Sequence, residues 1–131
     1  MIVADASIAI ALLTGSGSAE RAWPRVESEP RLHVPHLFDL EVVNALRRIV
    51  RGGRMPPGRA RVVIARLDSQ LRVHRHGHAP LLDRIWALRD NLTAYDASYV
   101  ALAERLGAIL LTQDRGIAEA PGIHCGVELF V

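Results

Sequence analysis

The segment TAYDASYVALAERLGAILLTQDRGIAEA, residues 93–120, predicts a helix, a strand and a second helix in immediate succession. Thr93 favours a helix N-cap, and the helix that it opens runs through Leu106 until a glycine stops it. The run AILLT (108–112) is continuously apolar, which is typical of a strand buried on both faces of a parallel sheet. Asp114 then begins a short helical segment. This order of elements decides the fold class, because helices that alternate with buried strands imply an α/β domain.

The same alternation continues on both sides of this segment. We expect further strands at residues 1–4, 31–34, 71–76 and 126–131, and further helices at residues 6–13, 19–28, 36–51, 56–70 and 79–90. Ser18 is a candidate N-cap for the helix at 19–28, which Pro24 should kink or shorten. The sequence therefore predicts a single three-layer α/β/α domain over residues 1–131, with a parallel, roughly five-stranded central sheet.

Composition limits the location and the chemistry of the chain. Half of the 131 residues are hydrophobic but only 5% are aromatic, so the core must be mainly aliphatic. No apolar run approaches the length of a bilayer span, so we expect no membrane association. The N-terminus lacks a basic region and carries Asp5 in its apolar stretch, which argues against a signal peptide. The single cysteine, Cys125, excludes an intramolecular disulfide and fits a cytoplasmic protein; we expect it to be a small buried hydrophobe.

The positive charge is unevenly distributed and consists only of arginine. All 16 basic residues are Arg, and seven of them fall between Glu41 and Asp68 without an intervening acid. Guanidinium groups bind phosphate through paired donors, which makes an anionic polymer a reasonable partner. On the charge run alone, an ordinary solvated helix face is the favoured interpretation. The absence of lysine excludes a Walker-A phosphate loop and Schiff-base chemistry.

Four carboxylates are candidates for one site. Asp5 and Asp114 follow predicted strands, and ligands of open α/β sheets bind beyond the carboxyl ends of strands. Asp96 lies in the first turn of the helix opened by Thr93, in a sequence that resembles a capping box. Taken singly, each of these three aspartates is more simply explained as a helix-capping residue.

The fourth carboxylate, Glu41, lies on a strongly amphipathic helix. Glu41, Asn44, Arg48 and Arg51 fall within an arc of about 80° at 100° per residue. The opposite, core-facing side is expected to consist of Val42, Val43, Leu46, Ile49 and Val50. A solvated stripe would have the same pattern. The arrangement nevertheless places an acid and an amide at one end of a face whose other end is cationic.

The combination of the four acids predicts a metal site. Carboxylates that converge without cations repel one another, and some of their pKa values rise. Ligation by oxygen alone suits Mg²⁺ or Mn²⁺ rather than zinc. Such ions activate water and stabilise the charge that develops during in-line displacement at a phosphodiester.

Four motifs resemble the PIN-domain family, specifically the VapC toxins of bacterial and archaeal toxin–antitoxin pairs. They are MIVADAS (1–7), LEVVNALRR (40–48), TAYDASYVALAERLGA (93–108) and AILLTQDRGIAEA (108–120), and they occur in the family's order. The resemblance implies a five-stranded parallel sheet and an endoribonuclease that cuts RNA with Mg²⁺ or Mn²⁺, leaving 5′-phosphate and 3′-hydroxyl ends. It also implies a homodimer and a cognate VapB-type antitoxin. The stretch around Pro24 is the least similar to the family.

The resemblance assigns roles to particular residues. The matching acids, which are both catalytic and metal-binding in the family, are Asp5, Glu41, Asp96 and Asp114. Asn44 matches a frequent polar neighbour, and Ser7 and Thr112 match hydroxyl positions close to the acids. We expect Arg48 and Arg51 to bind RNA from positions about 10 and 15 Å along the helix from Glu41, too far to touch the scissile phosphate.

Two other functions stay open at this point. One is a phosphatase or dehalogenase with an aspartate nucleophile after the first strand. The phosphatase normally has a second aspartate where this chain has Ser7, and both enzymes normally have a lysine. The other is a catalytically weak PIN-fold module that binds RNA or protein. Retention of all four acids argues against such degeneracy.

The histidines and tryptophans have simpler explanations. His74, His76 and His78 alternate, which would put them on one face of a strand and suggests metal binding. Gly77 interrupts that strand, so surface histidines are the favoured interpretation. Trp23 and Trp86 are expected to be core residues rather than base-stacking ones.

Overall fold

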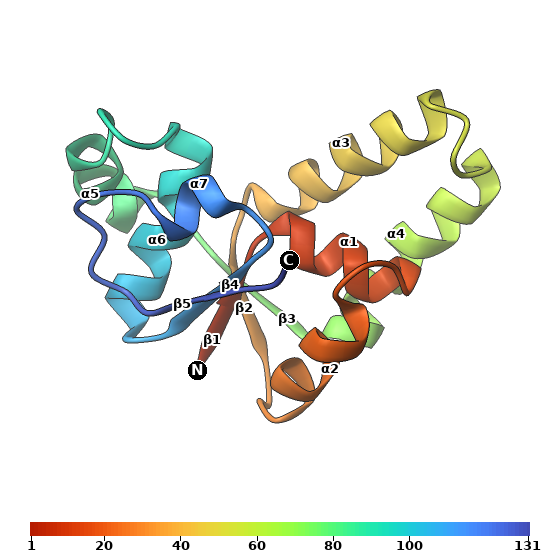
Figure 1. Cartoon of the computed structure of the whole chain (residues 1–131), viewed down its shortest axis with the longest axis horizontal. Helices are drawn as coiled ribbons and strands as arrows, with labels where there is room; N and C mark the ends of the chain where they lie inside the picture. The colour runs from red at the N-terminus through yellow and green to blue at the C-terminus, as the bar shows by residue number, and fades with distance from the viewer.

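The computed structural model describes residues 1–131 and has five parallel strands between two layers of helices (Figure 1). The strands are β1 (Ile2–Ala4), β2 (Leu32–Pro35), β3 (Val73–His76), β4 (Ile109–Thr112) and β5 (Val127–Leu129). Their order across the sheet is β3-β2-β1-β4-β5, and every neighbouring pair is parallel. The expected α/β/α architecture with a five-stranded parallel sheet is confirmed.

The helices divide between the two faces of the sheet. One layer contains α1 (Ala6–Thr14), α2 (Ala19–Glu27), α3 (Phe38–Arg51) and α4 (Pro57–Leu71); the other contains α5 (Leu82–Ala87), α6 (Ala94–Leu106) and α7 (Arg115–Ala118). Helices α3 and α4 form an antiparallel hairpin whose tip extends away from the sheet, whereas α6 packs across β1, β2 and β4 (Figure 1). None of the helices combines the length and the apolar character that a membrane crossing requires.

The core is aliphatic, as the composition predicts. All three residues of β1 are completely buried, and so are Leu110 and Leu111 of β4. These two strands occupy the middle of the sheet and are covered on both faces, which explains their unbroken apolar sequence. Gly107 ends α6 with a left-handed backbone (φ +63°), where a side chain would be strained.

Three local expectations are wrong or incomplete. The side chain of Ser18 does not cap α2; its hydroxyl instead accepts a hydrogen bond from the Gln113 side chain at 2.6 Å. The helix with Pro24 inside it, α2, is only one residue shorter than the expected 19–28 and ends at Glu27. The helix expected over residues 79–90 is a 3-10 turn at Ala79–Leu81 followed by the short α5, which ends at Ala87.

Two predicted core residues lie at the surface. Val43 is 42% exposed, whereas Val42 and Leu46 on the same helix are buried, so the apolar side of α3 is narrower than expected. Trp86 is 69% exposed, with the Arg89 guanidinium 4.6 Å from its ring centroid. Trp23, in contrast, is partly buried and packs against the core, as does Cys125.

Candidate active site

The carboxyl ends of β1 and β4 lie side by side at the centre of the sheet, and an aspartate follows each strand. The register pairs Ala4 of β1 with Leu111 of β4. Asp5 directly follows β1, and Asp114 comes two residues after β4. Because parallel strands end at the same edge, the topology alone brings these two segments together.

Asp5 is the most buried acid of the site, with 6% of its surface exposed. It caps α1, since its Oδ1 accepts the backbone N–H of Ile8 at 3.2 Å. The same oxygen accepts the Ser7 hydroxyl at 2.5 Å, and Oδ2 accepts the hydroxyl of the buried Thr112. The capping interpretation and the site interpretation of Asp5 are therefore compatible, because Oδ2 receives only one donor from the protein and keeps a lone pair available.

Ser7 and Thr112 also connect Asp5 to the loop that carries Asp114. The Ser7 hydroxyl oxygen accepts the backbone N–H of Gln113 at 3.1 Å, and the Thr112 hydroxyl oxygen accepts that of Asp114 at 2.9 Å. Each hydroxyl thus donates to Asp5 and accepts from the loop after β4. The expectation that both hydroxyls lie close to the acids is confirmed, and their effect is to hold two chain segments in one position.

Asp114 is exposed and caps the short helix α7. Its Oδ1 accepts the backbone N–H of Gly116 at 2.7 Å. A Cβ atom at position 116 would come within 3.0 Å of this same oxygen. Glycine at this position therefore allows the carboxylate to stay close to its own helix.

The other two acids come from opposite layers of the fold. Asp96 lies in the first turn of α6, where its backbone N–H donates to the Thr93 hydroxyl at 3.2 Å, as the predicted cap requires. Glu41 lies in the first turn of α3, and its Oε1 accepts the hydroxyl of Tyr99, a buried residue of α6, at 2.6 Å. This hydrogen bond crosses the carboxyl edge of the sheet and links the two helical layers.

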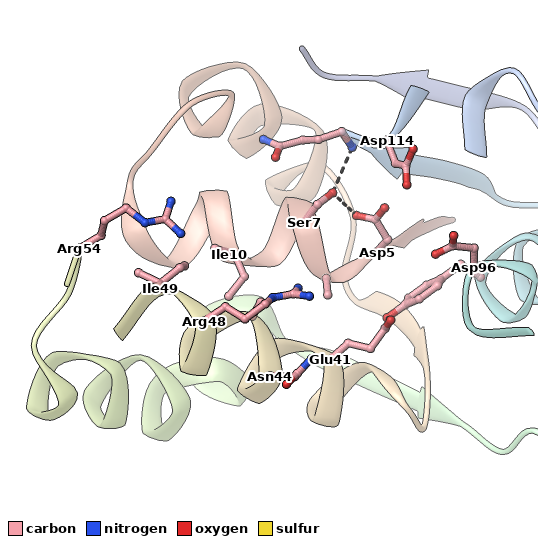
Figure 2. Close-up of a pocket in the computed structure, with 14 residues that line it drawn as sticks. Asp5, Ser7, Ile10, Glu41, Asn44, Arg48, Ile49, Arg54, Asp96 and Asp114 are labelled. Carbon is pink, nitrogen blue, oxygen red and sulfur yellow. Dashed lines mark hydrogen bonds between the residues drawn. The ribbon is translucent and has the colours of Figure 1, made fainter. Parts of the chain in front are cut away.

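All four acids line one open pocket of about 460 Å³ (Figure 2). The other predicted residues on its wall are Ser7, Asn44 and Arg48. Two predicted residues lie off the wall, because Thr112 is completely buried beneath Asp5 and Arg51 is an exposed residue of the last turn of α3. The pocket therefore brings together the four carboxylates that the sequence marks as candidates for one site.

Burial and mutual repulsion raise the pKa values of three of these acids. Burial is the largest cause at Asp5, whose hydrogen bonds offset only part of the rise in its pKa. Burial also raises the pKa of Glu41 and Asp96, and the negative charge of the neighbouring acids raises both further. Such a cluster is electrostatically costly when it is ionised, and a bound cation would relieve that cost.

Two arginines contribute positive charge to the pocket. Figure 2 shows the Arg48 side chain extending from α3 towards the acids, and its charge lowers the pKa of Glu41 in opposition to burial. Arg48 therefore comes closer to the acids than its distance along the helix axis suggests. Distance along a helix axis does not include the length of the side chain, which can point back along the helix. Arg54, in the turn between α3 and α4, lines the far end of the same pocket.

Sequence reasoning missed Tyr99, Arg54 and Gln113 as pocket residues. Tyr99 shares the face of α6 that also carries Asp96, three residues earlier, and this spacing is the one signal that could have identified it. Arg54 and Gln113 belong to turns whose paths depend on the packing of distant elements. No local pattern distinguishes them from other polar turn residues.

Comparisons with known proteins agree with this geometry. A family model described as the PIN domain matches residues 2–123. A VapC ribonuclease of Mycobacterium bovis, Mb0985, is 40% identical over 129 residues, which is 98% of both chains. Ribonuclease VapC1 of Mycobacterium tuberculosis is 39% identical over 128 residues, or 97% of this chain and 96% of its own length.

Solved structures have the same fold. PAE2754 from Pyrobaculum aerophilum superposes with a TM-score of 0.70 at 27% identity, over 96% of this chain and 81% of its own. VapBC2 from Rickettsia felis, bound to a DNA fragment from its promoter, superposes with a TM-score of 0.72 over 100% of both chains. Its 12% identity makes it a similarity of fold alone.

Proposed function

The chain belongs to the PIN-domain family and to its VapC ribonucleases, and on that premise we propose that it is an endoribonuclease which hydrolyses RNA phosphodiesters in the acidic pocket. The observation that carries the proposal is the convergence of Asp5, Glu41, Asp96 and Asp114, from four separate segments, on one pocket that also holds arginine. The names of the relatives at about 40% identity support the same activity.

The donor set of the pocket fits Mg²⁺ or Mn²⁺. Every candidate ligand is a carboxylate oxygen, and hard divalent ions prefer such ligands. Asp5, Asp96 and Asp114 would hold the principal ion, while Glu41 would orient the water or help to hold a second ion. When bound, such an ion supplies Lewis-acid chemistry, which activates water and stabilises the charge that develops on the phosphodiester.

The residues around the acids have definable tasks. Tyr99 holds Glu41 through a hydrogen bond of 2.6 Å, so the carboxylate keeps a fixed orientation towards the pocket. Burial raises the pKa of Glu41, which brings this carboxylate closer to the basicity needed to accept a proton from water. Arg48 is positioned to contact an RNA phosphate beside the acids, and Arg54 to contact one at the far end of the pocket. Asn44, on the same wall, is a neutral donor or acceptor for the RNA.

The phosphatase or dehalogenase alternative is disfavoured by the surroundings of Asp5. A nucleophilic aspartate must bring an oxygen into direct contact with the substrate, yet Asp5 is only 6% exposed and its hydrogen bonds leave a free lone pair on Oδ2 alone. The chain also has no lysine to stabilise a covalent intermediate of either enzyme.

A toxin–antitoxin role extends the proposal. We infer that the chain, acting as one domain over residues 1–131, works as a homodimer in the cytoplasm and is restrained by a VapB-type antitoxin. Membership of the VapC ribonucleases, shown by relatives at about 40% identity, supports a partner of this kind. Expression of the chain alone should arrest bacterial growth, whereas Glu41→Gln should be tolerated; equal tolerance of both would remove the toxin role.

The direct experiment incubates the purified chain with total RNA in Mg²⁺, in Mn²⁺ or in chelator and maps the new 5′ ends. New 5′-phosphate ends that require the metal and are missing with Asp114→Asn support the proposal. Cleavage that continues in chelator, or that is unchanged in Asp114→Asn, would overturn it.

A further inference from the structure

Three histidines gather on one face of the sheet edge formed by β2 and β3. The parallel register places His33 of β2 directly beside His74 of β3, and His76 follows two residues later on the same face of β3. One ring nitrogen from each of His33, His74 and His76 lies within 4.8 Å of the other two. We define these three residues as the histidine cluster; none of them lines the acidic pocket.

The membership of the cluster differs from the alternation visible in the sequence. His78 follows the end of β3, and its Nε2 accepts the backbone N–H of Leu37 at 3.0 Å. The third histidine beside His74 and His76 is instead His33, which lies on the neighbouring strand β2 and is remote in sequence. The cluster thus combines two strands, and its ligand atoms are held by the hydrogen-bonded register of the sheet.

The geometry of the cluster is close to that of a metal site with imidazole ligands. The Nδ1 atom of His33 and the Nε2 atom of His76 are 2.9 Å apart and share a hydrogen bond, in which one nitrogen donates and the other accepts. A metal ion between them would replace the shared proton. Two imidazole nitrogens bound to one tetrahedral zinc ion lie roughly 3.3 Å apart, given bonds of about 2.0–2.1 Å. The exposed His74 ring stacks on the His76 ring, with centroids 4.6 Å apart, and would have to turn to direct a nitrogen to the same point. Water or another ligand can complete the coordination.

The protonation state of the cluster also suits a cation. Burial lowers the pKa of His33, and the neighbouring imidazoles lower it further. Burial and His74 act in the same direction on the pKa of His76. These lower pKa values favour the neutral form of both rings, and a neutral imidazole has one nitrogen with a lone pair. The one acid whose charge reaches His33 is Glu29, which also contacts the N-terminal ammonium at 3.4 Å.

From this arrangement we propose that His33, His74 and His76 form a second metal site, which binds an imidazole-preferring transition-metal ion such as Zn²⁺, Ni²⁺ or Cu²⁺. The site goes beyond the ribonuclease activity and is chemically distinct from the acidic pocket, since carboxylates suit Mg²⁺ and imidazoles suit the later transition metals. Because its ligands come from both strands, the bound ion cross-links the edge strand β3 to β2.

The test titrates Zn²⁺ into the full chain, purified without a histidine tag and kept in excess Mg²⁺. Working in the Asp96→Asn/Asp114→Asn background removes two acids of the pocket and separates this test from that of the proposed ribonuclease. Calorimetry measures stoichiometry and affinity, and long-range proton–nitrogen NMR identifies the imidazole nitrogens that shift. The expected result is one Zn²⁺ per chain, with shifts at all three rings of the cluster.

Two variants provide the matched comparison. His74→Gln removes an exposed ligand without disturbing the core and should weaken Zn²⁺ affinity at least tenfold, since even outer-shell changes cost about 10–100-fold. His124→Gln removes an exposed histidine outside the cluster and should leave the affinity unchanged. Equal affinity in the parent and His74→Gln, equal weakening by His124→Gln, or no binding by the parent would each overturn the proposal.

Discussion

The acidic pocket and the histidine cluster are both candidate metal sites, but the fold builds them in different ways. The pocket lies where strands end, so its acids come from loops and helix starts that the topology brings to one edge. The cluster lies on one face of the sheet. Its residues belong to two neighbouring strands, and their proximity depends on the register in which these strands pair. Burial raises the pKa of Asp5, Glu41 and Asp96 and lowers the pKa of His33 and His76. A buried site thus favours the neutral form of either ligand type, but only the neutral imidazole is ready to bind a cation.

The largest expected effect on RNA cleavage comes from Asp5→Asn, which tests whether activity in the pocket requires the negative charge of Asp5. We expect RNA cleavage to fall by at least about a thousandfold, as when a main transition-state stabiliser is lost. Because burial raises the folded-state pKa of Asp5, its favourable contribution is complete below its ordinary pKa and is lost as the pH rises through the folded value. At pH 7 the metal-free Asn variant should therefore be as stable as the parent or more so.

Cleavage assays in Mg²⁺ and urea unfolding in chelator measure the two halves of this prediction. His74→Gln is the control, because it lies outside the pocket and should keep the parent rate. Full activity of Asp5→Asn in excess Mg²⁺ would remove Asp5 from the site. A variant that is both inactive and much less stable would instead indicate a structural role.

The second largest effect is expected in thermal stability, when each metal is added to a variant of the acidic pocket and to a variant of the histidine cluster. An ion at a hundred times its dissociation constant stabilises the fold by about 2.7 kcal/mol, which corresponds to roughly 10 °C in melting temperature. Mg²⁺ should produce this shift in His74→Gln but not in Asp96→Asn/Asp114→Asn. In excess Mg²⁺, Zn²⁺ should stabilise the double variant fully and His74→Gln by at most about half as much, because a tenfold weaker affinity leaves about 1.4 kcal/mol. Melting curves that respond to both metals alike in both variants would show that the two regions are not separate sites.

The contrast between the regions also explains how much the sequence could predict. Asp5 and Asp114 were predictable because a strand, its end and the next helix are visible locally, and parallel strands end at one edge. The role of His33 was not predictable, because the pairing of β2 with β3 in a given register depends on the whole sheet. Val43 and Trp86 were wrongly predicted to be core residues. Helical periodicity shows which side of a helix is apolar, but it does not show how much of that side a neighbouring element covers.

Tyr99→Phe should have a smaller effect, because it leaves every acid in place and removes only the hydrogen bond to Glu41. That bond lowers the pKa of Glu41 against the rise caused by burial, so its loss should raise this pKa further. The acidic limb of kcat/KM should move to higher pH, and the rate at neutral pH should fall about tenfold. Stability should fall by about 1 kcal/mol. An unchanged pH profile with lower stability would make Tyr99 a packing residue only.

The smallest expected effect separates Arg48 from Arg51, which have similar positions on the helix but different relations to the pocket. Arg48 lines the pocket and lowers the pKa of Glu41, whereas Arg51 is exposed beyond it. If both contact RNA phosphates, either substitution by alanine should reduce the salt dependence of binding by about 0.7 per lost contact on a single strand. Only Arg48→Ala should also lower the rate at saturating RNA, because only Arg48 is close to the reacting phosphate.

Affinity measured against salt concentration, together with single-turnover rates and molar mass by light scattering, tests this difference. The competing interpretation places α3 in an interface with a second chain, where Arg51→Ala would change the molar mass and leave the salt slope as it was. That result would remove Arg51 from the RNA path. Equal rates for the two variants at saturating RNA would mean that Arg48, despite its place on the pocket wall, acts only in binding. The positive charge of α3 would then serve affinity along its whole length, and the acids alone would carry the chemistry.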